Sequence, residues 1–124
     1  MKKRKLKNEI DYKELTAIID GWPYIITGYY EDDDTELAFW SFGDKCGHRW
    51  RPANEGCVII DPVRKTILDR LVVRDNGKQL KPDYWKWRQE QIKKRGKFRF
   101  YMDGGTQKRC RTILRNRLGT SYTN

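Results

Sequence analysis

The chain has 124 residues, of which 37% are hydrophobic and 13% aromatic, and its net charge is +10. This length predicts one domain with a modest core, and the lack of a run of 18 apolar residues argues against a membrane-spanning helix. No apolar stretch follows the basic N-terminus and the three cysteines are an odd number, which predicts a cytoplasmic protein with reduced thiols.

The positive charge is concentrated in the last third of the chain. Residues 1–80 hold 14 basic and 14 acidic residues, whereas residues 81–124 hold 13 basic and 3 acidic residues. Such asymmetry is typical of proteins that bind a polyanion, most often nucleic acid. We therefore expect residues 1–8 to form a flexible basic arm. Residues 9–124 are expected to form one domain whose binding surface lies in its strongly basic end.

The first third of the chain predicts a helix followed by a hairpin. Apolar residues recur at helical spacing behind Asp11, a suitable N-cap, so we expect a helix over residues 12–20. Residues 24–30 and 35–43 are rich in β-branched and aromatic residues, and the acidic run 31–34 between them predicts a hairpin turn. This acidic run could also contact a basic surface on a partner protein.

The middle of the chain contains both loop and strand signals. Residues 44–56 are interrupted by Gly, Pro and Asn and predict a long loop, and residues 57–60 predict a buried strand. The next residues fit either a helix capped by Asp61 or strands. The Asn-Gly pair at 76–77 is a strong hairpin signal and favours strands over residues 66–80.

The C-terminal third predicts two helices around one strand. Residues 83–95 begin with an acid, end with bases and stop at Gly96, as a helix does. Residues 97–102 alternate basic and aromatic side chains, which predicts a strand with its aromatic side in the core, and residues 107–118 predict a last helix. The complete prediction is an α+β fold: a small antiparallel sheet of about 4–6 strands, an N-terminal helix and two C-terminal helices.

The start of the last predicted helix has the features of an anion site. Its first amides have no partner within the helix and the helix dipole adds positive charge there, while glycines allow an anion to approach the backbone. The plain alternative is an ordinary cap followed by a solvated basic face. The predicted phosphate site comprises Gly104, Gly105, Thr106, Lys108, Arg109, Arg111 and Arg115.

Aromatic and basic residues are interleaved in two blocks, which is typical of surfaces that stack bases and neutralise phosphates. The alternative is that Trp and Tyr replace missing aliphatic residues in the core. The predicted nucleic-acid surface comprises Lys3, Arg4, Lys5, Arg88, Lys93, Lys94, Arg95, Lys97 and Arg99. The predicted stacking residues are Trp50, Trp85, Trp87 and Tyr101; Trp85 and Trp87 would point to different sides of a helix, so one of them is expected outside the core.

The sequence offers little for catalysis. Cys46, His48, Cys57 and Cys110 match no standard zinc spacing, and we recognise no catalytic triad or nuclease set, so we expect no metal, no cofactor and no enzyme activity. The leading hypothesis is a small non-catalytic protein that binds DNA or RNA. One alternative is a protein that sequesters a nucleotide at the predicted anion site, such as a phage anti-defence protein; another is an inhibitor of a nucleic-acid enzyme. A homodimer is compatible with each.

Overall fold

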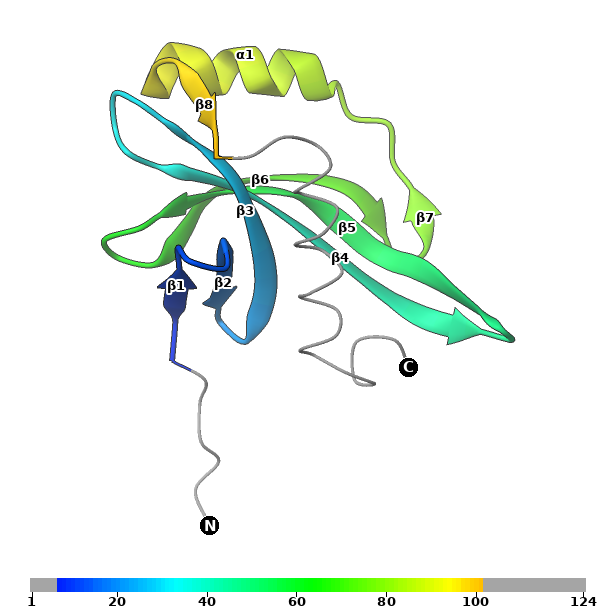
Figure 1. Ribbon diagram of the computed structural model, residues 1–124. Helices are drawn as coiled ribbons and strands as arrows, with labels where there is room; N and C mark the ends of the chain where they lie inside the picture. Colours follow the sequence, from blue (N-terminus) through cyan, green and yellow to red (C-terminus); the bar gives the residue numbers. More distant parts are fainter. Residues whose placement is uncertain (1–6, 102–124) are drawn as a thin grey trace.

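The computed structural model describes residues 7–101, apart from the side chains of residues 44–46 and 50. Within that part of the chain, eight strands form one antiparallel sheet, and a single helix, α1 (Tyr84–Arg95), lies across it (Figure 1). The predicted α+β fold with three helices is therefore wrong, because the protein is mostly antiparallel sheet. No helix within residues 7–101 is long and apolar enough to cross a bilayer.

The first seven strands lie in the sheet in the order of the chain, and β8 pairs with β3. β2 pairs with the first part of β3, whereas β8 pairs with its last residues. The strands are β1 (Glu9–Asp11), β2 (Thr16–Ile19), β3 (Trp22–Tyr30), β4 (Glu36–Cys46), β5 (Arg49–Asp61), β6 (Thr66–Asp75), β7 (Lys78–Gln79) and β8 (Phe98–Phe100).

The predicted N-terminal helix over residues 12–20 is wrong, because its residues form a turn and a strand. The carboxylate of Asp11 accepts hydrogen bonds from the backbone of the second and third residues after it, at 3.0 and 3.1 Å, and so closes a turn rather than capping a helix. The β-branched segment β2 then pairs with β3. Asp20 and Gly21 connect the two strands with positive φ angles of 53° and 82°, as a type I′ hairpin requires.

The predicted loop over residues 44–56 is also wrong. β4 and β5 stay paired along their whole length, from the pair Glu36 and Ile60 to the pair Cys46 and Arg49. Residues 44–56 therefore belong to a long two-stranded ribbon, whose end projects from the body of the sheet (Figure 1). The register shifts between Phe42 and Gly43, where Ala53 is the extra residue of a bulge and Pro52 is paired with Gly43. Pro52 lies beyond the part of β5 that pairs with β6, which begins at Glu55. A proline is tolerated there because its missing N–H removes no ladder bond.

Other predicted elements are confirmed. The hairpin of residues 24–30 and 35–43 forms within β3 and β4, and residues 66–80 form β6 and β7 around the Asn76-Gly77 turn. α1 begins after Asp83, whose carboxylate accepts a hydrogen bond from Lys86 N at 3.0 Å, and it ends at Gly96. The predicted last helix over residues 107–118 lies outside the described residues.

The strand at residues 98–100 is confirmed, but its aromatic side is only partly in the core. Phe98 is half-buried and packs on the cluster beneath α1, whereas 61% of Phe100 is exposed. The prediction that both rings belong to the core is therefore wrong for Phe100. β8 is an edge strand and covers only the end of β3, so its outer ring meets solvent.

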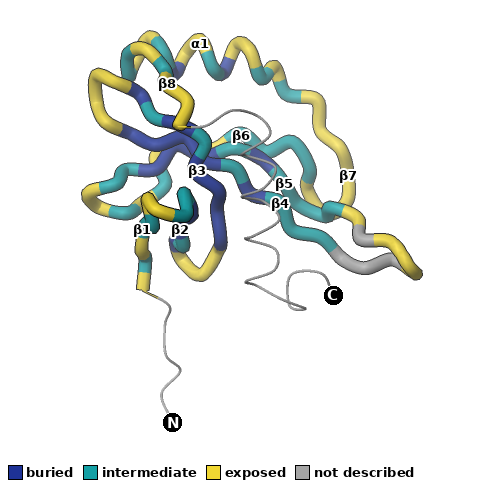
Figure 2. The backbone as a smooth tube through the Cα atoms, in the orientation of Figure 1, coloured by how far each residue is buried: buried dark blue, intermediate teal, exposed yellow. Residues whose placement is uncertain are grey.

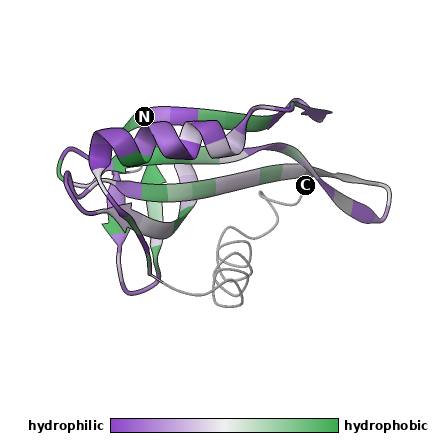
Figure 3. Ribbon diagram, turned by 90° about the horizontal axis from the view of Figure 1, so that it is seen from above, coloured by the Kyte–Doolittle hydropathy of each residue, from purple (hydrophilic) through white to green (hydrophobic). Residues whose placement is uncertain are grey.

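Two apolar clusters lie on opposite faces of the sheet, because successive side chains of a strand point to opposite sides. The buried residues are concentrated in β3 and in the central parts of β4 and β5 (Figure 2). α1 covers one of them and is hydrophilic on its outer surface (Figure 3). That cluster contains Tyr30, Leu37, Ile59 and Trp87. The other cluster lies where β1, β2 and β3 curl over the sheet, and contains Ala17, Ile19, Tyr24, Ile26, Ala38, Trp40, Val58 and Ile60.

Candidate nucleic-acid interface

Six of the cations predicted to bind nucleic acid are among the described residues, on and beside α1 and β8. Two of them are neutralised by the tip of the β3–β4 hairpin. Arg95 Nη1 lies 2.7 Å from Asp33 Oδ2, and Arg99 pairs with Glu31. Arg88 is half-buried against aromatic rings. The exposed cations of this set that make no ion pair within the described part of the chain are Lys93, Lys94 and Lys97.

The acidic hairpin tip is bound to the protein's own basic segment. Its backbone amides also take part, since Glu31 N donates to Lys97 O at 3.0 Å and Asp32 N donates to Arg95 O at 2.9 Å. Burial alone would raise the pKa of Asp33, but hydrogen bonds from Thr35 and Arg95 hold that pKa below its ordinary value. These contacts reduce the support for a tip that docks on a partner protein.

Several predicted site residues lie outside the described residues. They are the anion site Gly104, Gly105, Thr106, Lys108, Arg109, Arg111 and Arg115, and the arm residues Lys3, Arg4 and Lys5.

The predicted stacking residues do not share one surface. Trp85 is 71% exposed on α1, whereas Trp87 is 8% exposed and belongs to the core. One of these two tryptophans therefore lies outside the core, as predicted. Tyr101 donates a hydrogen bond to Glu36 at 2.9 Å, and the side chain of Trp50 is outside the described part.

A different set of aromatic residues forms a groove of about 520 Å³ on the sheet face opposite α1. The ring centroids of Trp22 and Phe42 are 4.3 Å apart, and those of Tyr24 and Trp40 are 6.1 Å apart. Trp22 is 50% exposed, whereas Tyr24 and Trp40 form the buried floor. The groove is lined by Trp22, Tyr24, Trp40, Phe42, Asn54, Arg70, Val72, Arg74, Asp75 and Leu80.

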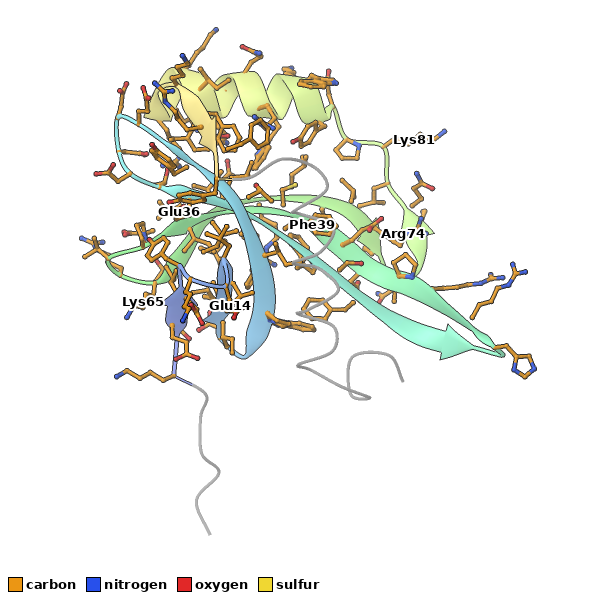
Figure 4. The ribbon with its side chains drawn as sticks, in the orientation of Figure 1. Glu14, Glu36, Phe39, Lys65, Arg74 and Lys81 are labelled. Atoms are coloured by element: carbon orange, nitrogen blue, oxygen red, sulfur yellow. The ribbon has the colours of Figure 1, made fainter. Side chains whose placement is uncertain are left out.

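Two arginines of β6 supply positive charge to this groove (Figure 4 labels Arg74). Arg70 is exposed, its Cζ lies 5.6 Å from the centroid of the Trp40 ring, and it makes no ion pair with any described residue. Arg74 is held by Glu55 at 3.5 Å and by the carbonyl of Gly77 at 3.1 Å. Arg70 is therefore the groove cation that is most available to a ligand.

A glycine on the central strand lets the groove floor form. Trp40 and Gly56 are paired across β4 and β5, and a Cβ atom on Gly56 would overlap the Trp40 ring and the backbone oxygen of Leu71. The indole can therefore lie flat across β5 and reach toward Arg70 on β6. Any larger residue at this position would push the ring out of the groove floor.

The comparisons with known proteins give no further guidance. No protein-family model, no curated protein and no solved structure matches this chain. Among the described residues, no group of three His, Cys, Asp or Glu side chains could hold a metal ion. His48 is exposed in the turn at the end of the β4–β5 ribbon. The function is therefore inferred from the geometry and charge of the groove.

Sequence reasoning missed the groove, although a signal for it was present. Trp22 and Tyr24 are two residues apart on β3, and Trp40 and Phe42 are two residues apart on β4. Residues two apart on a strand share a face, so each pair lies on one side of the sheet. The pairing of β3 with β4 then brings the two pairs together.

Glu36 is a buried carboxyl group that contacts Tyr101, the last described residue of the chain. Glu36 is 3% exposed, and its Oε1 accepts hydrogen bonds from Tyr12 at 3.0 Å and Tyr101 at 2.9 Å (Figure 4). Its Oε2 is buried and has no hydrogen-bond partner among the described residues. Burial raises the pKa of Glu36, and the two tyrosine hydrogen bonds only partly oppose this rise. Burial, together with the charge of Glu36, also raises the pKa of Tyr12 to about 12.

We predict that stability falls as Glu36 ionises. Its folded pKa lies above its ordinary value of 4.5, so the folded state holds a proton that the unfolded state has released, and stability is lost as pH rises through the folded pKa. Urea unfolding of the Glu36→Gln variant should depend less on pH between 4.5 and neutrality than that of the parent. Glu90→Gln, at an exposed position on α1, should leave the pH dependence unchanged. Equal slopes for the parent and Glu36→Gln would contradict the prediction.

Proposed function

We propose that the protein binds single-stranded nucleic acid, without catalysis, in the aromatic groove. The observation that carries the proposal is the half-exposed Trp22 ring, which lies against Phe42 in a groove that the guanidinium of Arg70 also lines. An aromatic side chain on a sheet surface stacks an unpaired base, and a neighbouring arginine neutralises its phosphate. Bases inside a duplex are already stacked and do not offer these faces.

The β4–β5 ribbon would extend the contact beyond the groove. It continues from the groove residues Phe42 and Asn54, and it carries the exposed cations Arg49 and Arg51. A single-stranded nucleic acid that leaves the groove along the ribbon would meet these two arginines. The basic ends of the chain would add affinity that does not depend on sequence.

The sequence-based alternatives remain as competing hypotheses. A groove of about 520 Å³ is also large enough for a mononucleotide, so sequestration of a nucleotide predicts a preference for the monomer over the strand. Inhibition of a nucleic-acid enzyme through the acidic tip has less support, because that tip is paired with Arg95 and Arg99. Location in the cytoplasm and a phage origin stay predictions from the sequence.

The first test is a fluorescence-anisotropy titration with labelled single-stranded and duplex DNA and RNA at two salt concentrations. We expect the single strands to bind more tightly than the duplexes, with an affinity that falls as salt increases. Trp22→Ala should weaken binding by about 1–3 kcal/mol, because it removes a stacking ring. Trp85→Ala is the matched control, since that tryptophan is exposed on α1, away from the groove.

A second variant tests the charge of the groove. Arg70→Gln should lower the slope of log affinity against log salt by about 0.7, the value for one phosphate contact on a single strand. Arg64→Gln, in the exposed turn between β5 and β6, should leave the slope unchanged. Loss of binding in Trp85→Ala but not in Trp22→Ala would mean that the nucleic acid binds at α1 and not in the groove. Tighter binding of a mononucleotide than of any strand would favour sequestration.

A further inference from the structure

A second pocket, of about 290 Å³, lies on the other face of the sheet, beside α1 and β8. Its walls are mostly apolar, with rings from three different elements: Phe39 of β4, Tyr84 of α1 and Phe100 of β8 (Figure 4 labels Phe39). One cation, Arg88, also lines it. The complete lining is Thr27, Leu37, Ala38, Phe39, Cys57, Val73, Tyr84, Arg88 and Phe100.

The guanidinium of Arg88 has no counter-ion among the described residues. It is half-buried, and its Cζ lies 4.4 Å from the centroid of Phe98 and 5.6 Å from that of Tyr84. Its Nη1 donates to the Tyr84 hydroxyl at 2.6 Å, but its Nε is buried and has no acceptor in the described part of the chain. Nor does Arg88 form an ion pair with any described carboxylate. A charge withdrawn from water in this way is costly unless an anion meets it.

Two other buried donors beside Arg88 also lack acceptors among the described residues. They are the hydroxyl of Tyr30, which is 0% exposed, and the indole Nε1 of Trp87, which is 8% exposed. Burial raises the pKa of the Tyr30 hydroxyl and the nearby Arg88 guanidinium opposes this rise, so the two groups lie close to each other. Its ring packs 5.0 Å from Phe98, the ring that Arg88 covers. Neither Tyr30 nor Trp87 lines the pocket, so Arg88 is the donor that a bound group would contact, and Trp87 is its neighbour on α1.

We propose that this pocket binds a small monoanion with a planar aromatic body, of the benzoate type. The guanidinium of Arg88 balances one negative charge, and the two oxygens of a carboxylate can accept from more than one of its N–H groups. The rings of Phe39, Tyr84 and Phe100 suit a planar apolar body. Inorganic phosphate, largely a dianion at neutral pH, would leave negative charge uncompensated and would not fill the apolar walls. This site lies on the sheet face opposite the groove, so it does not depend on the nucleic-acid proposal.

The test is a titration of the ¹⁵N-labelled full chain with sodium benzoate, followed by NMR. The indole N–H signal of Trp87, identified from its loss in Trp87→Phe, and the Nε–H signal of Arg88 should shift. The indole signals of Trp22 and Trp40 in the groove should not. Benzamide, which has the same shape without the charge, should bind about tenfold more weakly, because it loses a charge-assisted contact.

Two variants test separately whether benzoate binding needs the charge of Arg88 and whether it needs the volume of the pocket. Arg88→Met removes the cation and should lower benzoate affinity about tenfold or more. Val73→Phe should have a similar effect, because it fills the pocket and leaves Arg88 in place; it also keeps the test open if Arg88→Met does not fold. Arg70→Met, in the groove, is the control and should bind benzoate like the parent.

Three results would overturn the proposal. They are the absence of shifts at Trp87 and Arg88 up to about 10 mM benzoate, equal binding of benzamide and benzoate, and tighter binding of inorganic phosphate than of benzoate.

Discussion

Replacement of Gly56 by alanine should lower the free energy of unfolding by about 3 kcal/mol, at the upper end of the usual cost of overpacking. The added methyl group would overlap the backbone oxygen of Leu71 and would lie 2.8 Å from Cζ3 of Trp40. The indole must leave its place, and the overlap with Leu71 is relieved only if β6 shifts against its pairing with β5. Urea unfolding measures the loss of stability, and the shift of the Trp40 indole N–H signal reports the displaced ring.

Gly77→Ala is the matched control for this substitution. Gly77 has a positive φ of 80°, but a Cβ there meets no atom within 4 Å, so only the backbone preference is disturbed. That change should cost about 1–2 kcal/mol. If the proposed function holds, Gly56→Ala should also weaken binding of single strands, whereas Gly77→Ala should not. Equal stability losses in the two variants would contradict the close packing of Trp40 on β5.

Gln91→Met should remove about 2–3 kcal/mol of stability, because it breaks the buried polar link between α1 and the sheet. Gln91 is 0% exposed; its Nε2 donates to Asp69 Oδ2 at 2.5 Å, and its Oε1 accepts from Arg95 Nε at 2.9 Å. Arg95 in turn pairs with Asp33 on the β3–β4 hairpin. Methionine has a similar shape but leaves the Asp69 carboxylate oxygen without its donor. Urea denaturation measures this change in the free energy of unfolding.

Gln89→Met makes the same substitution on the exposed side of α1 and should change stability by less than about 0.5 kcal/mol. The hydrogen-exchange rates of the α1 amides should increase in the Gln91→Met variant by at least the factor that corresponds to its loss of global stability. The reason is that the helix loses its hydrogen bond to Asp69 on β6. An unchanged denaturation midpoint in Gln91→Met would mean that apolar packing alone holds α1 on the sheet.

The two candidate sites use opposite faces of the same strands. β4 presents Trp40 and Phe42 to the groove and Leu37 and Phe39 to the pocket beneath α1. The variants Trp22→Ala and Arg88→Met therefore probe different ligands on one scaffold. A single-stranded nucleic acid bound in the groove and a small anion bound beside α1 would not compete for space.

Local signals in the sequence predicted many elements but not the chain's overall class. The Asn76-Gly77 turn, the caps of α1 and the strands at residues 24–30 and 66–80 follow from neighbouring residues and are confirmed. The helix predicted over residues 12–20 is wrong because Asp20 and Gly21 form a hairpin turn between β2 and β3. Its β-branched residues gain hydrogen bonds from β3, which helical spacing alone does not reveal.

The candidate sites depended on pairings between distant residues. Charge counts correctly place the cations in the last third, but they do not show that Arg95 and Arg99 are neutralised by the hairpin tip at Asp33 and Glu31. Richness in aromatic residues predicted stacking, yet Trp87 is in the core, and the groove is built from Trp22 and others that were not singled out.

The charge distribution, the Asn76-Gly77 turn and the ends of α1 follow from the sequence alone, because each depends on residues close together in the chain. Which aromatic rings meet, and which cations make no ion pair among the described residues, depends on the pairing of strands that are distant in the chain. Trp22, Trp40 and Arg70 come from three strands, and the pairing of β3 through β6 brings them to one face. The register of that pairing is set by the burial of the whole sheet, so no local pattern contains it.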